Sequence, residues 1–255
     1  MHPSTRHTAI LKLLGTNGTC SVSEFVRQLG VSDETVRRDI KSLANRGLIE
    51  RVRGGAMLPA VVQEPDFQNR MSHNSAEKRA IAREAAGLIE NGDSILLENG
   101  STTLFVARAL AQHQDLFVVS NGLEIARTLL NHRNNRVFLA GGAVREDDGA
   151  ILGADAVAFV QRFRLRYVFI TVGAIHPEGG LMNFYFDETE FAINALAQAS
   201  HLVVVADHSK FRAQAPVRLC DIDRIGTLIT DRQPPEPMVQ RLKEAEVRLI
   251  IANPE

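Results

Sequence analysis

The chain has 255 residues, of which 45% are hydrophobic and 23% are charged, and its formal net charge at pH 7 is −1. These values are typical of a globular protein with one large domain or two unequal ones, and no apolar run approaches the roughly 18 residues of a membrane span. The two cysteines lie far apart and the N-terminus lacks the basic-then-apolar order of a secretory signal, so we expect a cytoplasmic protein with no disulfide framework and no membrane contact.

The small net charge conceals an uneven distribution along the chain. Residues 1–58 contain nine Lys and Arg against five Asp and Glu, a net charge of +4. Residues 59–255 contain twenty against twenty-five, a net charge of −5. A small basic piece joined to a larger acidic one indicates that the first binds nucleic acid and that the second has a different role.

Residues 1–58 are expected to form three short helices and a hairpin. Apolar residues recur at helical spacing within 6–18, 21–30 and 31–47, and a tight glycine-containing turn separates the second helix from the third. In 48–58, apolar and charged residues alternate as they do in a short strand or wing. Helix, tight turn and helix followed by a wing predict a winged helix-turn-helix domain.

The third of these helices carries a cationic face. Its apolar residues Val36, Ile40 and Leu43 mark one side for burial and leave the basic side chains outside. A solvated surface would explain a lone Arg-Arg pair, but this pair lies on the helix that enters the major groove in helix-turn-helix proteins. Asp39 would repel DNA on that face, so we expect it to pair with a neighbouring basic residue. The residues predicted to contact a double-stranded DNA operator are Ser32, Thr35, Arg37, Arg38, Lys41, Arg51 and Arg53.

A linker and a second domain are predicted to follow. Residues 59–73 contain two prolines and show no clear periodicity, which predicts a linker before a domain at residues 74–255. Asn74 and Glu77 have the spacing of a capping box at the start of a helix. Beyond it, β-rich runs that are apolar on both faces alternate with amphipathic helical segments, as in α/β folds with a mostly parallel sheet. The expected strands are 94–98, 116–120, 136–140, 167–172, 201–206, 225–230 and 247–251.

Small and polar residues follow several of these strands, where parallel sheets bind their ligands. Gly100 allows a close approach, and the three hydroxyl residues after it lie beside free backbone N–H groups at a predicted helix N-terminus, which suits a phosphate. Ordinary N-capping would explain the same residues without a ligand. No P-loop and no dinucleotide-binding glycine pattern occurs. The candidate ligand residues are Glu98, Gly100, Ser101, Thr102, Thr103, Asn121, Gly141, Gly142, Arg145, Asp207 and Lys210.

Several motifs together resemble the DeoR family of bacterial transcription regulators. The stretch "GVSDETVRRDIKSLANRGLIERVRGGA" is similar to the DNA-binding module of that family, and "FQNRMSHNSAEKRAIA" matches its F-x-x-R…N…E-K-x-x-I-A pattern. The motifs "GSTT", "SNG", "AGGAVR", "ILG" and "ADHSKF" follow in the family's order, so the resemblance covers essentially the whole chain. It is greatest to the subgroup that contains the glycerol-3-phosphate repressor.

This resemblance implies a repressor of carbohydrate metabolism genes. Its second domain would resemble sugar-phosphate isomerases and bind a phosphorylated sugar as effector, with the phosphate at Gly100–Thr103. Many members of the family have Asp where Glu98 stands and a basic residue near Asn194 and Ala195, so the sugar can differ from the usual one. Because operators have repeated half-sites, we also expect a homodimer or homotetramer.

An enzyme is the alternative that the sequence leaves open. Isomerisation of a sugar phosphate needs a positioned base, generally a carboxylate. The segment "TVGAIHPEGGL" has no carboxylate before Glu178, where the related isomerases have a D-G-A-D-E-like segment, and His176 is expected in an exposed turn. We therefore expect a sensor, with an isomerase-like enzyme tethered to DNA as the alternative. The eight histidines lack metal-binding spacing, and neither a metal ion nor an organic cofactor is expected.

Overall fold

The chain divides into two compact units, Met1–Gln63 and Glu64–Glu255, each with a hydrophobic core of its own. No helix in the described part of the chain is long and apolar enough to cross a membrane. The computed structural model describes residues 6–7, 9–10, 13–14, 19–45, 49–52, 54–57, 64–130, 133–211, 213 and 215–253.

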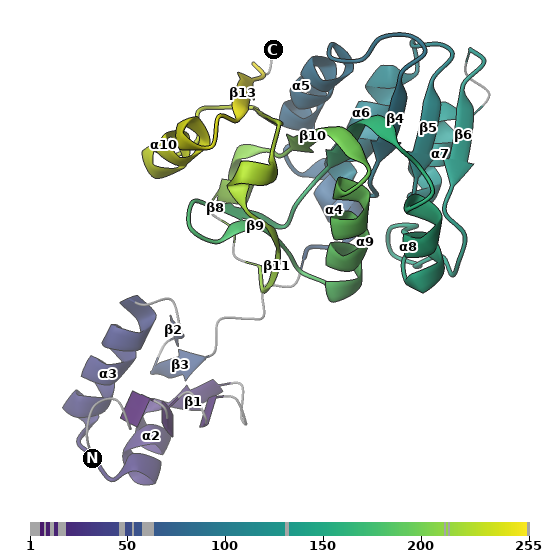
Figure 1. Ribbon diagram of the computed structural model, residues 1–255. Coiled ribbons are helices and arrows are strands. Elements are labelled where there is room, and N and C mark those ends of the chain that lie inside the picture. The colour runs from purple at the N-terminus through teal and green to yellow at the C-terminus, as the bar shows by residue number, and fades with distance from the viewer. Residues whose placement is uncertain are drawn as a thin grey trace. The chain divides into compact units, whose positions relative to one another are not determined.

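The first unit combines helices with a small antiparallel sheet (Figure 1). Helix α2 (Val22–Leu29) begins with a capping box, in which Ser21 and Glu24 exchange hydrogen bonds, and ends at Gly30 in the left-handed conformation. Helix α3 (Asp33–Asn45) follows after a short turn, and the described residues between 6 and 14 are also helical. The sheet has the order β1-β3-β2, with β1 (Thr19–Ser21), β2 (Glu50–Val52) and β3 (Gly55–Met57). This is the predicted winged helix-turn-helix.

A seven-stranded sheet forms the second unit. Its order is β13-β12-β10-β7-β4-β5-β6, and every neighbouring pair is parallel. Each of the seven strands expected from the sequence is present, which confirms the predicted α/β class. The strands are β4 (Ser94–Leu97), β5 (Phe117–Ser120), β6 (Arg136–Leu139), β7 (Leu165–Ile170), β10 (Ala199–Val205), β12 (Thr227–Thr230) and β13 (Arg248–Ile251).

Helices cover both faces of this sheet (Figure 1). Successive side chains of a strand point to opposite faces, so Ile95 and Leu97 of β4 pack into one apolar cluster and Leu96 into the other. The first cluster contains residues of α4 (Phe67–Ser72), α5 (Ser75–Ala86), α6 (Ser101–Leu110) and α7 (Leu123–Leu129). The second contains residues of α8 (Ala154–Val160), α9 (Phe186–Leu196) and α10 (Glu236–Glu244).

Several short elements differ from the sequence-based expectation. Helix α4 lies within residues 59–73, where a linker without a helix was expected. It was missed because six residues make fewer than two turns and show no period in the sequence. A second antiparallel sheet, of order β11-β9-β8, was not predicted either. Its strands are β8 (Ala174–His176), β9 (Gly180–Asn183) and β11 (Val217–Cys220), and two 3-10 turns, η1 (His208–Phe211) and η2 (Ile222–Arg224), lie nearby in the chain.

The strand order reverses between β4 and β7. From β4 the sheet continues through β5 to β6, whereas β7 begins the other half, which runs through β10 and β12 to β13. Open α/β sheets bind ligands in the crevice beyond the carboxyl ends of the strands at such a reversal. Residues 98–100 follow β4 and residues 171–173 follow β7, so these two segments border the expected place of a ligand.

Candidate functional site

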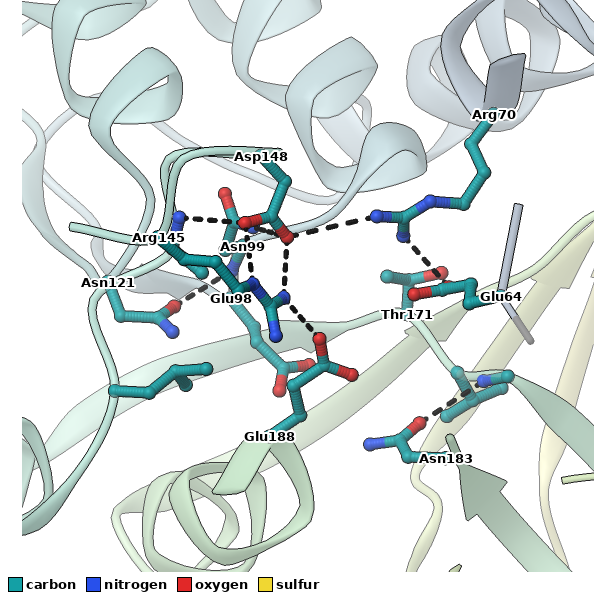
Figure 2. Close-up of a pocket in the computed structure, with 14 residues that line it drawn as sticks. Glu64, Arg70, Glu98, Asn99, Asn121, Arg145, Asp148, Thr171, Asn183 and Glu188 are labelled. Atoms are coloured by element: carbon teal, nitrogen blue, oxygen red, sulfur yellow. Dashed lines mark hydrogen bonds and ion pairs between the residues drawn. The ribbon is translucent and has the colours of Figure 1, made fainter. Parts of the chain in front are cut away.

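A pocket lies beyond the carboxyl ends of β4, β5 and β7 (Figure 2). It is partly open to solvent, and its side chains as they stand leave about 20 Å³ of free volume, which is room for about one water molecule. Its walls also include residues of α4, of the loop before α8, of β9 and of α9. Most of the lining side chains are polar, and six are ionisable: Glu64, Arg70, Glu98, Arg145, Asp148 and Glu188.

Asp148 stands at the centre of an ion-pair network in this pocket. It accepts hydrogen bonds from Arg145, Nε to Oδ1 at 2.9 Å and Nη2 to Oδ2 at 2.6 Å, and Arg145 also contacts Glu188. Asn99 Nδ2 donates to Oδ2 of Asp148 at 2.9 Å, and Nη2 of Arg70 lies 3.7 Å from the same oxygen. Burial alone would raise the pKa of Asp148, but the hydrogen bonds from Arg145 lower it below its ordinary value. Asp148 therefore remains ionised and fixes Arg145.

Two other carboxyl groups of the pocket are biased towards the protonated form. Burial, and then the charge of Glu188, raises the pKa of Glu98 well above its ordinary value. Burial raises the pKa of Glu188 to about 7, against the hydrogen bond from Arg145. Among the described residues, Oε2 of Glu98 has no hydrogen-bond partner, although only 5% of the residue is exposed. A buried, unpaired carboxyl oxygen in a pocket is available to a ligand hydroxyl.

The F-x-x-R…N…E-K pattern builds one wall of the pocket. Phe67 is buried at the start of α4, and its backbone N donates to Oδ2 of Asp147 at 3.3 Å. The guanidinium of Arg70 lies over the Phe67 ring at 5.3 Å. Lys78 Nζ donates to the carbonyls of Arg70 and His73, the latter at 2.9 Å, and so satisfies the last turn of α4. Burial lowers the pKa of Lys78 to about 8.

Asn74 stands at the N-cap position of α5, but its side chain does not cap the helix, so the predicted capping box was wrong. The residue has a left-handed backbone with φ 52°, and its side chain makes no capping hydrogen bond. Its Nδ2 instead donates to Oδ1 of Asp207 at 2.9 Å, which ties the start of α5 to the loop after β10. Asp207 also accepts from the hydroxyl of Ser209 at 2.5 Å. Burial lowers the pKa of Lys210, while the charges of Glu64 and Asp207 favour its protonated form.

The start of α6 lies close against the end of β7. A Cβ on Gly100 would stand 2.3 Å from Cγ2 of Thr171, so only glycine permits this approach. Ser101, Thr102 and Thr103 are buried in the first turn, and the hydroxyl of Thr103 donates to the carbonyl of Gly100 at 3.0 Å. The first N–H groups of a helix have no acceptor within it and carry the positive end of its dipole. In α6 these N–H groups follow the carboxyl end of β4, at the edge where parallel sheets bind their ligands.

The structure brings part of the predicted ligand set into the pocket. The predicted residues that line it are Glu98, Asn121 and Arg145, and those outside the lining are Gly100–Thr103, Gly141, Gly142, Asp207 and Lys210. Gly141 and Gly142 are exposed in the loop after β6. Sequence analysis did not single out Glu64, Arg70, Asp148 or Glu188 as ligand residues. The F-x-x-R pattern was the only signal for Arg70, and the acidic run beside Arg145 was the only one for Asp148.

In the first unit, α3 presents its arginines to solvent. Arg37 Nε donates to Oδ1 of Asp33 at 2.5 Å, and Arg38 Nη2 donates to Oε1 of Glu34 at 3.0 Å, each one turn earlier in the helix. The arginine side chains are 62% and 76% exposed. Water and salt screen such exposed i,i+4 pairs, so they contribute little to stability and phosphate groups of DNA can replace the carboxylates at little cost.

The wing lies beside this helix. Arg37 and Arg51 line one hollow between α3 and the β2–β3 hairpin. Ser32 and Lys41 are also exposed, and Ser32 Oγ accepts from the backbone N of Thr35 at 3.3 Å, as expected of an N-cap. Arg53, the remaining predicted DNA contact, lies outside the described residues.

Asp39 is buried and paired, as expected. Nε of Arg6 donates to its Oδ2 at 2.7 Å, and Nε2 of His7 lies 3.3 Å from Oδ1. Burial alone would raise the pKa of Asp39, but the hydrogen bond from Arg6 lowers it. The one acidic residue in the middle of α3 is therefore turned away from the exposed arginines.

Known proteins match both units. Residues 6–61 match the model of the DeoR-like helix-turn-helix domain, and residues 73–232 match that of the DeoR C-terminal sensor domain. The glycerol-3-phosphate regulon repressor of Haemophilus influenzae is 37% identical over 253 residues, which cover 99% of this chain and 98% of that protein. The HTH-type transcriptional repressor CsqR of Escherichia coli is 35% identical over 246 residues, 96% of this chain and 94% of that protein. Ribose 5-phosphate isomerase A from Methanocaldococcus jannaschii is similar to this chain over 54% of its residues and 55% of that protein, with a TM-score of 0.39 and 18% identity.

Proposed function

This chain belongs to the DeoR family of transcription regulators, and on that basis we propose that it represses carbohydrate metabolism genes under the control of a phosphorylated sugar. The winged helix-turn-helix binds operator DNA in the cytoplasm, and the effector binds in the pocket of the second unit. The observation that carries the effector proposal is the position of that pocket, because its ionisable lining lies where the strand order of a parallel sheet reverses.

DNA binding is assigned to the exposed face of α3 and to the wing. Each arginine that neutralises a phosphate releases condensed counterions, so affinity falls steeply with salt. In the full chain, Arg37→Ala combined with Arg38→Ala is expected to weaken binding of a duplex selected from a random pool. The slope of log affinity against log salt should become shallower by about 2.

The matched control for this experiment is Arg127→Ala combined with Arg218→Ala. Both arginines are exposed and pair with a carboxylate three residues away, but they lie in the second unit. Fluorescence anisotropy at several salt concentrations compares the two double variants. Equal slopes in both, or an unchanged slope after the α3 substitutions, would remove α3 from the DNA interface.

The effector is assigned to the pocket by the pocket's position and hydrogen-bonding capacity. We propose that its hydroxyls bind Glu98 and Asn121 in the lining, and that its phosphate binds the first N–H groups of α6, at residues 100–103, which directly follow the lining residues Glu98 and Asn99. A ligand at one hundred times its Kd stabilises the native state by about 2.7 kcal/mol. Scanning calorimetry of the full chain with triose, pentose and hexose phosphates should therefore show one transition raised by one member. The free sugars should have no such effect, and an equal response to them would remove the phosphate site.

A second candidate is turnover of the sugar phosphate. Two carboxyls with raised pKa in one pocket, Glu98 and Glu188, are what general acid–base catalysis requires. His176 is not the base, because it is exposed outside the pocket lining and its Nδ1 accepts the N–H of Gly179 at 3.1 Å. We favour binding without turnover, since the relatives reported above are named as repressors. Interconversion of ketose and aldose phosphates that disappears in Glu188→Gln would establish the enzyme instead.

Self-association is proposed because operator half-sites are repeated and favour symmetric proteins. The second unit exposes Tyr185, Phe186 and Ile193 along α9, with Phe186 73% exposed. Sedimentation of the full chain is expected to show a dimer or tetramer, and a monomer at the concentrations that saturate the duplex would refute this.

A further inference from the structure

Glu64 is the first residue of the second unit, and its side chain lies in the ligand pocket. Its Oε1 pairs with Nη1 of Arg70 at 2.8 Å, and both side chains are almost fully buried (Figure 2). Gln63, the preceding residue, already belongs to the unit that carries the DNA-binding helix. Of the pocket's ionisable groups, this carboxylate is therefore nearest in the chain to the DNA-binding unit.

Arg70 has more hydrogen-bonding capacity than the described residues use. Among them its buried Nε has no acceptor, and Nη2 is 3.7 Å from Asp148, too far for a hydrogen bond. A guanidinium offers its N–H groups as a fork that matches two oxygens of a phosphate. The ring of Phe67 and the bonds from Lys78 to the last turn of α4 hold this fork in place.

This fork lies beside the start of α6. Arg70 and Asn99, which precedes Gly100, both contact Oδ2 of Asp148. Asn99 and Glu98, the two residues before Gly100, line the same pocket as Arg70. The unpaired, buried Oε2 of Glu98 in the same pocket is a separate sign that a ligand belongs here.

Glu64 is the carboxylate of the pocket that an incoming anion replaces most easily. Asp148 accepts hydrogen bonds from Arg145, from Asn99 and from the backbone N–H of Ala150. Among the described residues, the ion pair found for Glu64 is with Arg70 alone. The charge of Glu64 also adds to burial in raising the pKa of Glu98 and Glu188, so another anionic group in its place keeps these two carboxyls biased towards the protonated form.

We propose that Glu64 occupies the place of the effector's phosphate, and that the effector displaces it from Arg70. Binding in the pocket then acts directly on the chain segment that leads to the DNA-binding unit. This inference rests on the effector function proposed above for the same pocket. Because the pair and the effector exclude each other, a change of Glu64 that weakens the pair and leaves Arg70 in place favours the effector-bound state.

The first test measures binding of inorganic phosphate, which is the group common to all phosphorylated effectors. Calorimetric titration of the full chain compares wild type, Glu64→Gln and the control Glu84→Gln, an exposed residue of α5 outside the pocket lining. We expect Glu64→Gln to bind phosphate at least about fivefold more tightly than wild type, the lower end of usual coupling between sites. Glu84→Gln should match wild type, and Arg70→Gln should bind none. Equal or weaker binding by Glu64→Gln overturns the proposal.

The second test measures DNA affinity without effector. Two wild-type affinities for the selected duplex serve as references: one without effector, and one saturated with the sugar phosphate that raises a calorimetric transition. The affinity of Glu64→Gln without effector should shift from the first reference towards the second. Glu64→Asp keeps the charge but has a side chain one methylene shorter, and it should shift the affinity in the same direction. This second variant keeps the test decisive if Glu64→Gln fails to fold. A wild-type chain that responds to no sugar phosphate refutes the effector function itself. A wild-type response with both variants unshifted refutes only the role of Glu64.

Discussion

Replacement of Gly100 by alanine tests the close approach between α6 and β7. The new Cβ would lie 2.3 Å from Cγ2 of Thr171 and 3.2 Å from Oγ1 of Thr103, whereas carbon atoms in contact are about 3.5–4.0 Å apart. The backbone of Gly100 is extended, with φ 169°, so alanine adds a steric clash without backbone strain. Overpacking of this kind costs about 1–3 kcal/mol. At about 2–4 °C per kcal/mol for a unit of this size, its melting temperature should fall by about 2–12 °C.

Calorimetry is the suitable assay, because the chain has no tryptophan and only two tyrosines for fluorescence. Gly87→Ala is the control, since its Cβ meets nothing closer than 3.4 Å and its backbone is already helical. Thr171→Ser removes the methyl group in the clash, so the Gly100→Ala, Thr171→Ser double variant should recover much of the lost stability. A Gly100→Ala chain that melts with wild type, or a double variant with no recovery, would show that α6 and β7 are not in this contact.

Three further predictions concern single side chains. The pKa of Glu188 is about 7 in the folded chain against an ordinary 4.5, so its stabilising contribution is complete below about pH 4.5 and is lost as pH rises through 7. Urea unfolding across this range should show wild type losing up to about 3 kcal/mol that Glu188→Gln does not lose. Asp39→Ala should lower the melting temperature of the first unit by removing the buried carboxylate that accepts hydrogen bonds from Arg6, and Asp39→Asn should lower it less. Asn74→Ala should cost the second unit about 1–2 kcal/mol in the same assay by removing a hydrogen bond to the ionised Asp207.

The sheet could be predicted from the sequence because most of its strands lie in continuous apolar runs. Parallel strands buried on both faces appear as continuous β-branched and apolar runs, as in residues 201–206, and such runs are visible without knowledge of their neighbours. The strands β8, β9 and β11 are about as short as most strands of the large sheet, but their apolar residues are interrupted by His176, Asn183 and Arg218, so they form no continuous apolar run. The pairing of β9 with β11 joins segments separated by residues 184–216, so it does not follow from local sequence.

The same difference separates the predicted from the unpredicted residues of the pocket. Glu98 and Asn121 follow strands directly, so the edge of the sheet on which they lie follows from local sequence. Arg70 and Glu188 reach the pocket from α4 and α9, and their positions depend on how these helices pack. Asn74 shows the limit of a local pattern, because its spacing to Glu77 suggested a cap whereas its partner is 133 residues away.

Both functional regions hold arginines against carboxylates, but burial gives the pairs different roles. On α3 the side chains of Arg37 and Asp33 are about 60% exposed, so water and salt screen the pair, and under the proposed assignment DNA phosphates replace the carboxylate readily. In the pocket the side chains of Arg70 and Glu64 are only about 10% exposed, so ions screen the pair far less and a competing anion must make good contacts to displace it. DNA affinity should therefore depend strongly on ionic strength, whereas exchange at Arg70 should depend on the shape and charge of the effector. A regulator needs this division, because its sensor must respond to one metabolite in a cell full of other anions.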